Sequence, residues 1–500
     1  MSLINVSSLT FAYDGSYDDI FRNVSFQIDT DWKLGFCGRN GRGKTTFLKL
    51  LMGEYEYSGT ISASVEFEYF PFNVADKSLD TIDIITSIVS DAERWKILKE
   101  LAMLDVEDDV LYRPFFTLSN GEQTKVLLAG LFLRENSFLL IDEPTNHLDM
   151  NAREIVARYL NGKKGFILVS HDRAFLDDCV DHILSINKAN IEVQRGNFSS
   201  WWYNKQMQDE YELAENEKLE KDIKRLKQAA RQSADWADNA ESSKRGKGAE
   251  KLRKKGHFGM GTMTYNAEKS RRMQQRRKNL ENRQQTAIDE KSSLLKNVET
   301  ADNLKIHPLK YHAAKLLTLE DVSITYDNRE ILRNLSFTLE QGDRLAIQGG
   351  NGSGKSSILK LITGENVPHV GQVNIGSRLI ISYAAQDASY LTGSLDEYAV
   401  VRQIDMTLLK TILRKLDFAR VQFEKGMEDY SAGQKKKVLL AASLCEQAHV
   451  YIWDEPLNYI DVLSRMQIEE LITSFKPTMI FVEHDRTFCD NIATKIVELK

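Results

Sequence analysis

The strongest constraint on the fold is an internal repeat that spans most of the 500-residue chain. Four short motifs occur twice in the same order, at offsets of 311 to 313 residues. Matched order and spacing predict two copies of one domain of about 200 residues. The first copies read GRNGRGKT (38–45), LSNGE (118–122), FLLIDEP (138–144) and FILVSHD (166–172), and the second copies read GGNGSGKS (349–356), YSAGQ (430–434), VYIWDEP (450–456) and MIFVEHD (479–485).

Each copy has the pattern of an α/β domain. Short apolar runs such as 138–141 and 450–453 are followed by polar motifs and then by helical patterns. Strands that alternate with helices indicate a mainly parallel sheet covered by helices. We therefore expect a first domain over 1–204, a second over 306–500 and an unduplicated segment over 205–305.

Two glycine-rich motifs fit the phosphate-binding pattern G-x-x-x-x-G-K-[ST]. Their glycines allow the backbone N–H groups to face phosphate oxygens at the start of a helix. The lysine would reach the β- and γ-phosphates, and the hydroxyl after it would bind Mg²⁺. The residues assigned to ATP are Gly38, Asn40, Gly41, Gly43, Lys44, Thr45 and Thr46 in the first copy, and Gly349, Asn351, Gly352, Gly354, Lys355, Ser356 and Ser357 in the second.

Carboxylates and histidines follow the later apolar strands of both copies. Asp142 and Asp454 end strands, as carboxylates on the Mg²⁺ side should. The next residues, Glu143 and Glu455, are placed to polarise an attacking water. A single histidine is usually structural, but His171 and His484 occupy equivalent positions, which favours contact with the γ-phosphate.

The unduplicated segment is strongly basic, although the chain as a whole carries a formal charge of −6. Residues 241–283 hold 14 Lys/Arg against 4 Asp/Glu, so the rest of the chain is near −16. Such a concentrated patch favours a polyanionic partner, and a solvated helix face is the plainer alternative. Four widely spaced cysteines, no apolar run of membrane-spanning length and no signal-peptide pattern lead us to expect a cytosolic protein.

The composition of the same segment predicts a helical hairpin. Residues 206–239 and 267–298 are rich in good helix formers with spaced apolar residues. Between them, Gly246, Gly248, Gly256, Gly259 and Gly261 are expected to interrupt the helix. A helix of about 35 residues would extend roughly 50 Å.

With these motifs in place, LSNGE and YSAGQ resemble the signature motif of ABC ATPases, and the resemblance covers nearly the whole chain. It implies two nucleotide-binding domains in a head-to-tail, intramolecular sandwich, so that each ATP lies between one phosphate-binding loop and the opposite signature. Ser431 and Gly433 would complete the first site, and Ser119 and Gly121 the second. Tyr13 and Tyr326 lie where the family stacks an aromatic ring on adenine, and packing at a strand end is the alternative.

The two copies depart from the family pattern in different ways. The family's glutamine that helps to bind Mg²⁺ corresponds to Gln386 in the second copy, but Phe72 takes its place in the first. A phenyl ring cannot bind Mg²⁺ or hold a water. Unequal ATP sites are therefore expected.

Two such domains joined by a basic helical segment resemble the ABC-F proteins, and within them the Lsa and Vga types of Gram-positive bacteria that give antibiotic resistance. The resemblance implies binding to the 70S ribosome at the tRNA exit site, near 23S rRNA and P-site tRNA, and displacement of lincosamides, pleuromutilins and streptogramin A by a tip at about 244–265. Basic side chains would contact rRNA phosphates, and apolar tip residues would press on bases, tRNA or the drug pocket. They are Lys244, Arg245, Lys247, Lys251, Arg253, Lys254, Lys255, Arg271, Arg272, Arg276 and Arg277, with His257, Phe258, Met260, Met263 and Tyr265 at the tip.

Three other functions stay open. A general ABC-F translation factor without a resistance role is the nearest alternative. A soluble ATPase subunit of a transporter would not need the basic segment. A DNA-handling ABC ATPase would carry a far longer coiled coil with regular heptads.

Overall fold

The computed structural model describes residues 2–13, 19–90, 92–187, 190–252, 286, 304–326 and 329–499, with side chains of the central segment as far as residue 228. The chain divides into two compact units, one of Met1–Trp201 with Ala301–Lys500 and the other of Trp202–Thr300. The first unit contains both copies of the repeat. None of the described helices is long and apolar enough to cross a membrane.

The first copy contains a three-stranded antiparallel sheet in the order β2-β1-β4 and a six-stranded sheet in the order β5-β6-β7-β3-β8-β9. In the larger sheet only β9 runs antiparallel. The strands are β1 (Leu3–Phe11), β2 (Phe21–Asp29), β3 (Lys33–Cys37), β4 (Ser58–Ser62), β5 (Glu66–Phe70), β6 (Ser137–Asp142), β7 (Phe166–Val169), β8 (His182–Asn187) and β9 (Asn190–Arg195). The helices are α1 (Lys44–Leu51), α2 (Thr81–Ile88), α3 (Arg94–Met103), α4 (Asn120–Phe132), α5 (Met150–Asn161) and α6 (Arg173–Cys179), with 3₁₀ turns at Asp108–Tyr112, Phe115–Thr117 and Pro144–His147.

The second copy repeats this plan with a three-stranded sheet β11-β10-β13 and a parallel five-stranded sheet β14-β15-β16-β12-β17. Its strands are β10 (Lys315–Tyr326), β11 (Arg329–Glu340), β12 (Arg344–Gln348), β13 (His369–Ile375), β14 (Ile381–Ala384), β15 (Val450–Asp454), β16 (Met479–Val482) and β17 (Lys495–Glu498). Its helices are α9 (Lys355–Ile362), α10 (Leu395–Arg402), α11 (Met406–Lys415), α12 (Ala432–Cys445), α13 (Val462–Phe475) and α14 (Arg486–Ile492), with 3₁₀ turns at Arg420–Glu424 and Met427–Asp429.

The parallel strands that end at the site motifs are the most buried part of each copy. Every residue of β7 and β16 is buried, because both faces of these strands are covered. The buried Trp453 of β15 donates its indole N–H to Ser443 Oγ at 2.9 Å, so the ring packs without an unpaired polar atom. A rigid sheet therefore fixes where the polar residues at the strand ends lie. This architecture confirms the predicted pair of α/β domains.

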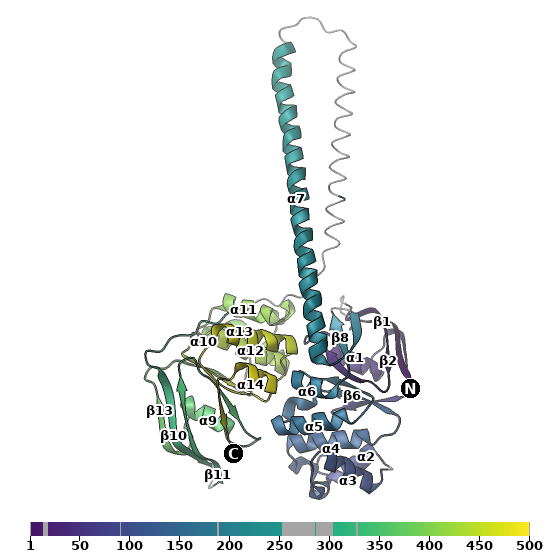
Figure 1. The fold of residues 1–500 in the computed structure, drawn as a ribbon, viewed down its shortest axis with the longest axis vertical. Helices are drawn as coiled ribbons and strands as arrows, with labels where there is room; N and C mark the ends of the chain where they lie inside the picture. The colour runs from purple at the N-terminus through teal and green to yellow at the C-terminus, as the bar shows by residue number, and fades with distance from the viewer. Residues whose placement is uncertain are drawn as a thin grey trace. The chain divides into compact units, whose positions relative to one another are not determined.

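The central segment begins with a longer helix than predicted. Helix α7 (Phe198–Leu252) has 55 residues, about 80 Å at 1.5 Å per residue, and Figure 1 draws it as one continuous teal helix. It runs through Gly246 and Gly248, so the prediction that these glycines interrupt the helix was wrong. A glycine weakens a helix by about 1 kcal/mol, and the surrounding Lys, Arg, Glu and Ala residues offset that cost. The predicted second helix and residues 253–265 of the predicted tip lie outside the described residues, apart from Thr286, which is helical.

Candidate active site

Both glycine-rich loops form a concave backbone cradle at the start of a helix. In the first, Gly41 and Gly43 have φ of 81° and 95°, and Gly43 caps α1 without a side-chain hydrogen bond. An added Cβ on Gly43 would lie 2.6 Å from Ile20 Cγ2, so only glycine fits there. The first backbone N–H groups of α1 therefore stay available to an anion.

The lysine of each loop folds back over the cradle. Lys44 Nζ donates to Gly38 O at 2.6 Å, and Lys355 Nζ donates to Gly349 O and Gly350 O at 2.8 Å each. Burial lowers the pKa of both lysines, which the nearby carboxylates oppose. A buried cation held only by carbonyl oxygens gains by meeting an anion, so both cradles suit a phosphate chain.

Oxygen ligands for a magnesium ion lie beside the first loop. Thr45 Oγ1 donates to Asp142 Oδ2 at 3.0 Å, and Tyr69 donates to the same oxygen at 2.9 Å. In the second copy, Asp454 is 2% exposed, and its Oδ1 has no hydrogen-bond partner among the described residues. Hydroxyl and carboxylate oxygens are the ligands that Mg²⁺ prefers, so these residues fit the ion.

The two glutamates follow their strands in a strained backbone conformation. Glu143 and Glu455 have φ of 51° and 45°, a region that costs other residues than glycine about 1 kcal/mol or more. The backbone N–H groups donate to Val169 O at 2.9 Å and to Val482 O at 3.0 Å, which pins each glutamate beside the strand that precedes the histidine. This backbone conformation directs each side chain toward the histidine of its own copy.

The two glutamates have opposite protonation. Burial and the nearby Asp142 raise the pKa of Glu143 to about 8, and His171 Nε2 lies 3.2 Å from its Oε1. Burial alone would raise the pKa of Glu455, but the polar groups of His484, Gln386 and Asn458 lower it to about 2, with Asn458 Nδ2 donating to its Oε2 at 2.6 Å and His484 Nε2 3.6 Å from its Oε1. Without nucleotide at neutral pH, Glu143 therefore holds a proton and Glu455 is ionised.

A cavity of about 400 Å³ brings the first loop together with the opposite signature motif. Asn40 Nδ2 crosses it to donate to Tyr459 O at 2.8 Å. An added Cβ on Gly433 would lie 2.7 Å from the same oxygen, which explains the glycine of the signature. The cavity is lined by the predicted residues Asn40, Gly41, Lys44, Thr45, Asp142, Glu143, His171, Ser431 and Gly433, and by others that include Phe418, Gln422, Gln434, Lys437 and Tyr459.

The signature serines act as helix caps. Ser431 Oγ accepts the Gln434 backbone N–H, and the Ser431 backbone N–H donates to Gln434 Oε1. These two bonds fix the start of α12. Ser119 and Glu122 do the same for α4. The contacts described for the second loop instead join it to Asp149, whose Oδ2 lies 3.9 Å from the Cβ position of Gly350. These contacts do not join Ser119 or Gly121 to Lys355.

The two tyrosines predicted to meet adenine remain partly exposed. Tyr13 is 42% exposed, and its hydroxyl lies 2.8 Å from Thr46 Oγ1. Its ring meets Phe11 and Tyr55 edge-on, with centroids 5.1 and 5.7 Å away, which leaves it in an aromatic cluster beside the loop. Tyr326 is 38% exposed at the end of β10.

A family model described as "ABC transporter" matches residues 21–146 and 332–458, just over half of the chain. The chain belongs to the ABC transporter family. Each match contains a phosphate-binding loop and a signature motif and ends three residues after Glu143 or Glu455. The geometry above therefore belongs to two ABC ATPase domains on one chain.

Curated relatives align along nearly the whole chain. The ribosome protection protein VmlR of Bacillus subtilis is 26% identical over 98% of this chain and 85% of its own. The putative ATP-binding protein YdiF of the same organism is 27% identical over 100% and 80%. ABC transporter F family member 2 of Arabidopsis thaliana is 23% identical over 99% and 76%. Among solved structures, the archaeal ribosome recycling factor aABCE1, in complex with stalk protein aP1, matches with a TM-score of 0.62 at 18% identity, over 98% of this chain and 87% of that one, and shares the fold.

The expected inequality of the two ABC sites has a structural counterpart. Gln386 follows β14 and hydrogen-bonds to Glu455, and both line a second cavity of about 440 Å³. Phe72 stands at the matching place after β5, and a hydrocarbon ring offers no such bond to Glu143. The lost polar contact contributes to the difference between the two glutamates.

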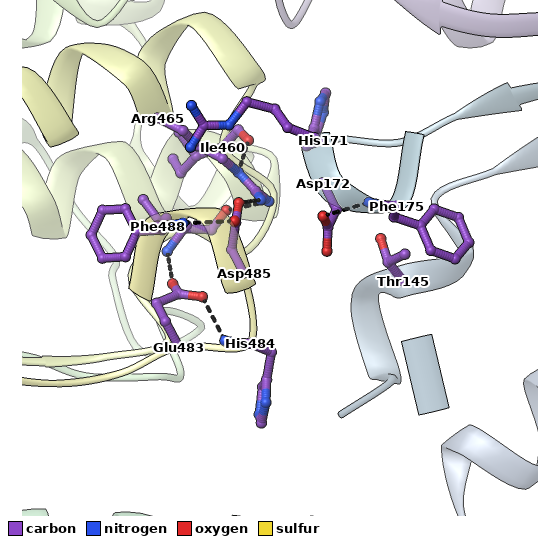
Figure 2. Close-up of polar contacts among 12 residues, drawn as sticks. Thr145, His171, Asp172, Phe175, Ile460, Arg465, Glu483, His484, Asp485 and Phe488 are labelled. Carbon is purple, nitrogen blue, oxygen red and sulfur yellow. Dashed lines mark hydrogen bonds and ion pairs between the residues drawn. The ribbon is translucent and has the colours of Figure 1, made fainter. Parts of the chain in front are cut away.

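The motifs did not predict two buried arginines, of which Arg153 also contacts the other ABC domain. Arg153 on α5 donates to Thr145 O at 3.1 Å, to Asp172 Oδ2 at 2.8 Å and, across to the other ABC domain, to His484 O at 3.0 Å. Arg465 on α13 makes the equivalent ion pair within the second domain, to Asp485 Oδ2 at 3.0 Å (Figure 2). The repeat held the signal, because each arginine comes four residues after the aspartate of its LD or ID dipeptide.

Figure 2 shows how these contacts order the loops that carry the histidines. Asp172 and Asp485, the residues after the histidines, accept the backbone N–H groups of Phe175 and Phe488 at 3.0 Å each and so cap α6 and α14. Burial, with the charges of Lys44 and Arg465, keeps the pKa of His171 well below its usual range. In the free chain His171 is neutral and can donate one hydrogen bond.

The basic residues predicted for RNA fall on two parts of the chain. Lys244, Arg245, Lys247 and Lys251 belong to α7. Arg253, Lys254, Lys255, Arg271, Arg272, Arg276 and Arg277, and the tip residues His257, Phe258, Met260, Met263 and Tyr265, lie outside the described residues.

Proposed function

We propose that this protein is an ABC-F ATPase that hydrolyses ATP at sites formed between its two ABC domains. The observation that carries the proposal is the cavity shared by Lys44, Glu143 and His171 of one domain and Ser431 and Gly433 of the other. Bound Mg²⁺ would neutralise phosphate charge, held by Thr45 and Asp142 in the first site, and by Ser356, Asp454 and Gln386 in the second.

The chain's own side chains have separate tasks in this reaction. Lys44 would exchange its loop carbonyls for phosphate oxygens, and His171 would donate to the γ-phosphate. Glu143 or Glu455 would orient the attacking water and take its proton. Glu455, which is ionised, is ready for this role, whereas Glu143 must first lose a proton.

We propose further that the ATP-bound protein binds the ribosome at the tRNA exit site and dislodges antibiotics from the peptidyl-transferase centre. Support comes from VmlR, which is named as a ribosome protection protein, and from the 14 basic residues at 241–283. ATP closes the domains and stabilises the bound form, and hydrolysis releases it. The partners would be 23S rRNA and P-site tRNA, and the drugs lincosamides, pleuromutilins and streptogramin A.

Ribosome pelleting tests the first part. The variant with both Glu143→Gln and Glu455→Gln keeps the size of the side chains but cannot accept the water's proton. With ATP it should accumulate in the ribosome pellet, whereas a matched Lys44→Ala and Lys355→Ala variant should not. Equal pelleting of the two variants would contradict the ATP-dependent cycle.

Drug susceptibility tests the second part and separates it from the role of a general translation factor. That alternative is favoured by relatives at the same identity whose names carry no resistance role, such as YdiF. Expression should raise tolerance to lincomycin, and deletion of residues 256–265 should abolish the gain without loss of ribosome pelleting. Unchanged tolerance with intact ribosome binding would leave the translation factor as the function.

A further inference from the structure

The start of α7 is tied to the helix that follows the first catalytic histidine. Asp177, in the last turn of α6, accepts the Ser199 backbone N–H at 2.8 Å through Oδ1 and the Ser199 hydroxyl through Oδ2. Ser199 is the second residue of α7, so its N–H has no partner within its own helix. Asp177 therefore caps α7 from a distance, and its negative charge suits the positive end of the helix.

Other contacts surround the first turn of α7. Phe198 and Trp201 in the first turn of α7 are 2% and 9% exposed, with ring centroids 5.5 Å apart. Just before the helix, Gly196 has φ of 128°, and its N–H donates to Asp181 O at 2.8 Å. The first turn of α7 is thus held to α6 and to the residues that follow it.

The other end of α6 reaches the ATP site. His171 lines the first cavity, and Asp172 caps α6 while it binds the buried Arg153. Helix α6 has only seven residues, so a shift of His171 toward a γ-phosphate would move one short helix whose last turn holds Ser199. A continuous set of contacts therefore runs from the phosphate position to the first turn of α7.

The second ABC domain offers an internal comparison. Its α14 corresponds to α6, and Asp490 corresponds to Asp177. Asp490 is 67% exposed, and the contact described for it is Arg486 at 3.8 Å on the same helix. The repeat thus supplies the carboxylate in both domains, and only the domain that precedes α7 uses it to hold another helix.

We propose that Asp177 is a positioning residue that couples the nucleotide state at His171 to the orientation of α7 through Ser199. The inference rests on the proposed ATPase cycle, and it extends that cycle by naming the joint through which ATP acts on the central segment. Asp177 touches neither nucleotide nor the reacting water.

The test is a distance measurement between two spin labels, one at Lys218→Cys on α7 and one at Lys164→Cys on the first ABC domain. The partly exposed Cys445 is replaced by serine, and Cys37, Cys179 and Cys489 are buried. The parent carries Glu143→Gln and Glu455→Gln so that ATP persists. Distances are recorded without nucleotide and with ATP, and ATP binding is titrated separately with a fluorescent analogue.

The parent should show a shift of the distance distribution on adding ATP. Asp177→Ala should bind ATP with unchanged affinity and lose the shift, whereas Asp177→Asn, whose Oδ1 can accept the Ser199 N–H while its Nδ2 donates to the Ser199 hydroxyl, should restore most of it. Asp490→Ala is the matched control and should behave as the parent. A full shift in Asp177→Ala, or no shift in a parent that binds ATP, would overturn the coupling. A parent that does not bind ATP would instead overturn the proposed ATPase function.

Discussion

Glutamine substitutions of Glu143 and Glu455 are expected to change stability in opposite directions. In the folded chain the pKa of Glu143 rises from its usual value of 4.5 to about 8, so folding requires the carboxyl to take up a proton above pH 4.5. Each pH unit of this kind corresponds to about 1.4 kcal/mol. The resulting cost is absent below pH 4.5, grows as pH rises, and is complete at about pH 8. At pH 7 it amounts to roughly 3 kcal/mol, which Glu143→Gln should remove.

The pKa of Glu455 shifts in the opposite direction, so its effect on stability also has the opposite dependence on pH. Its pKa falls from 4.5 to about 2 in the folded chain, so ionisation stabilises the fold above pH 4.5, and that contribution is lost as pH falls toward 2. Glu455→Gln should therefore cost roughly 3 kcal/mol at every pH from 5 to 8. The glutamine keeps the size of the side chain but cannot hold the charge that Asn458, Gln386 and His484 surround.

Calorimetric melting of the two variants and the parent, without nucleotide or Mg²⁺, measures both effects. A change of 1 kcal/mol shifts Tm by about 2–4 °C for a domain of this size, so each variant should differ from the parent by roughly 6–12 °C at pH 7, with opposite signs. The gain from Glu143→Gln should shrink at pH 5 and grow at pH 8. A lower Tm for Glu143→Gln, or a gain that is the same at pH 5 and pH 8, would refute the reasoning.

Two further substitutions test the backbone cradle and the interdomain contacts. Gly354→Ala places a Cβ 3.0 Å from a side chain at φ of 88°, and should weaken binding of a fluorescent ATP analogue at the second site by tenfold or more, on the order of 1–3 kcal/mol of strain. Gly342→Ala, at φ of 91° with nothing within 4 Å of the added Cβ, is the control. An equal loss of ATP binding in this variant would show that backbone strain alone, without contact in the cradle, weakens binding. Arg153→Ala leaves Asp172 buried and unpaired, and should lower stability by about 3–5 kcal/mol in the same melting experiment. A Tm within 2 °C of the parent would contradict that role.

The repeat allowed most of the fold to be predicted from sequence. Two α/β domains, their order and the strand ends that carry Asp142 and Asp454 follow from motifs whose chemistry needs a particular backbone at a particular place. The helix boundary at Gly246 could not be predicted in this way, because a glycine in a long helix is a balance of about 1 kcal/mol against many good helix formers.

The contacts between the domains were beyond motif reading for a different reason. The repeat marks Arg153 as an equivalent of Arg465 but not its partner, because its bond to His484 O depends on how two segments 331 residues apart meet. The contact of Asp177 with Ser199 could not be predicted either, because it depends on where the start of α7 lies. Sequence indicated which side chains could react, and the packing of the domains decided which of them share a cavity.

The two sites differ because Phe72 in the first copy takes the place that Gln386 has in the second. At the second site, Gln386 supplies a hydrogen bond that favours the ionised form of Glu455. At the first site, Phe72 cannot supply such a bond. Burial and the nearby charge of Asp142 raise the pKa of Glu143. An ionised glutamate can accept a proton from water and a protonated one cannot, so in the proposed reaction the second site starts ready for hydrolysis. At the first site, Thr45 and Asp142 would hold Mg²⁺, whose charge would offset that of Asp142 and favour loss of the proton from Glu143. Two copies of one domain plan thus give two sites with different starting states, and in the proposed coupling the first site, whose His171 precedes α6, is the one that acts on α7.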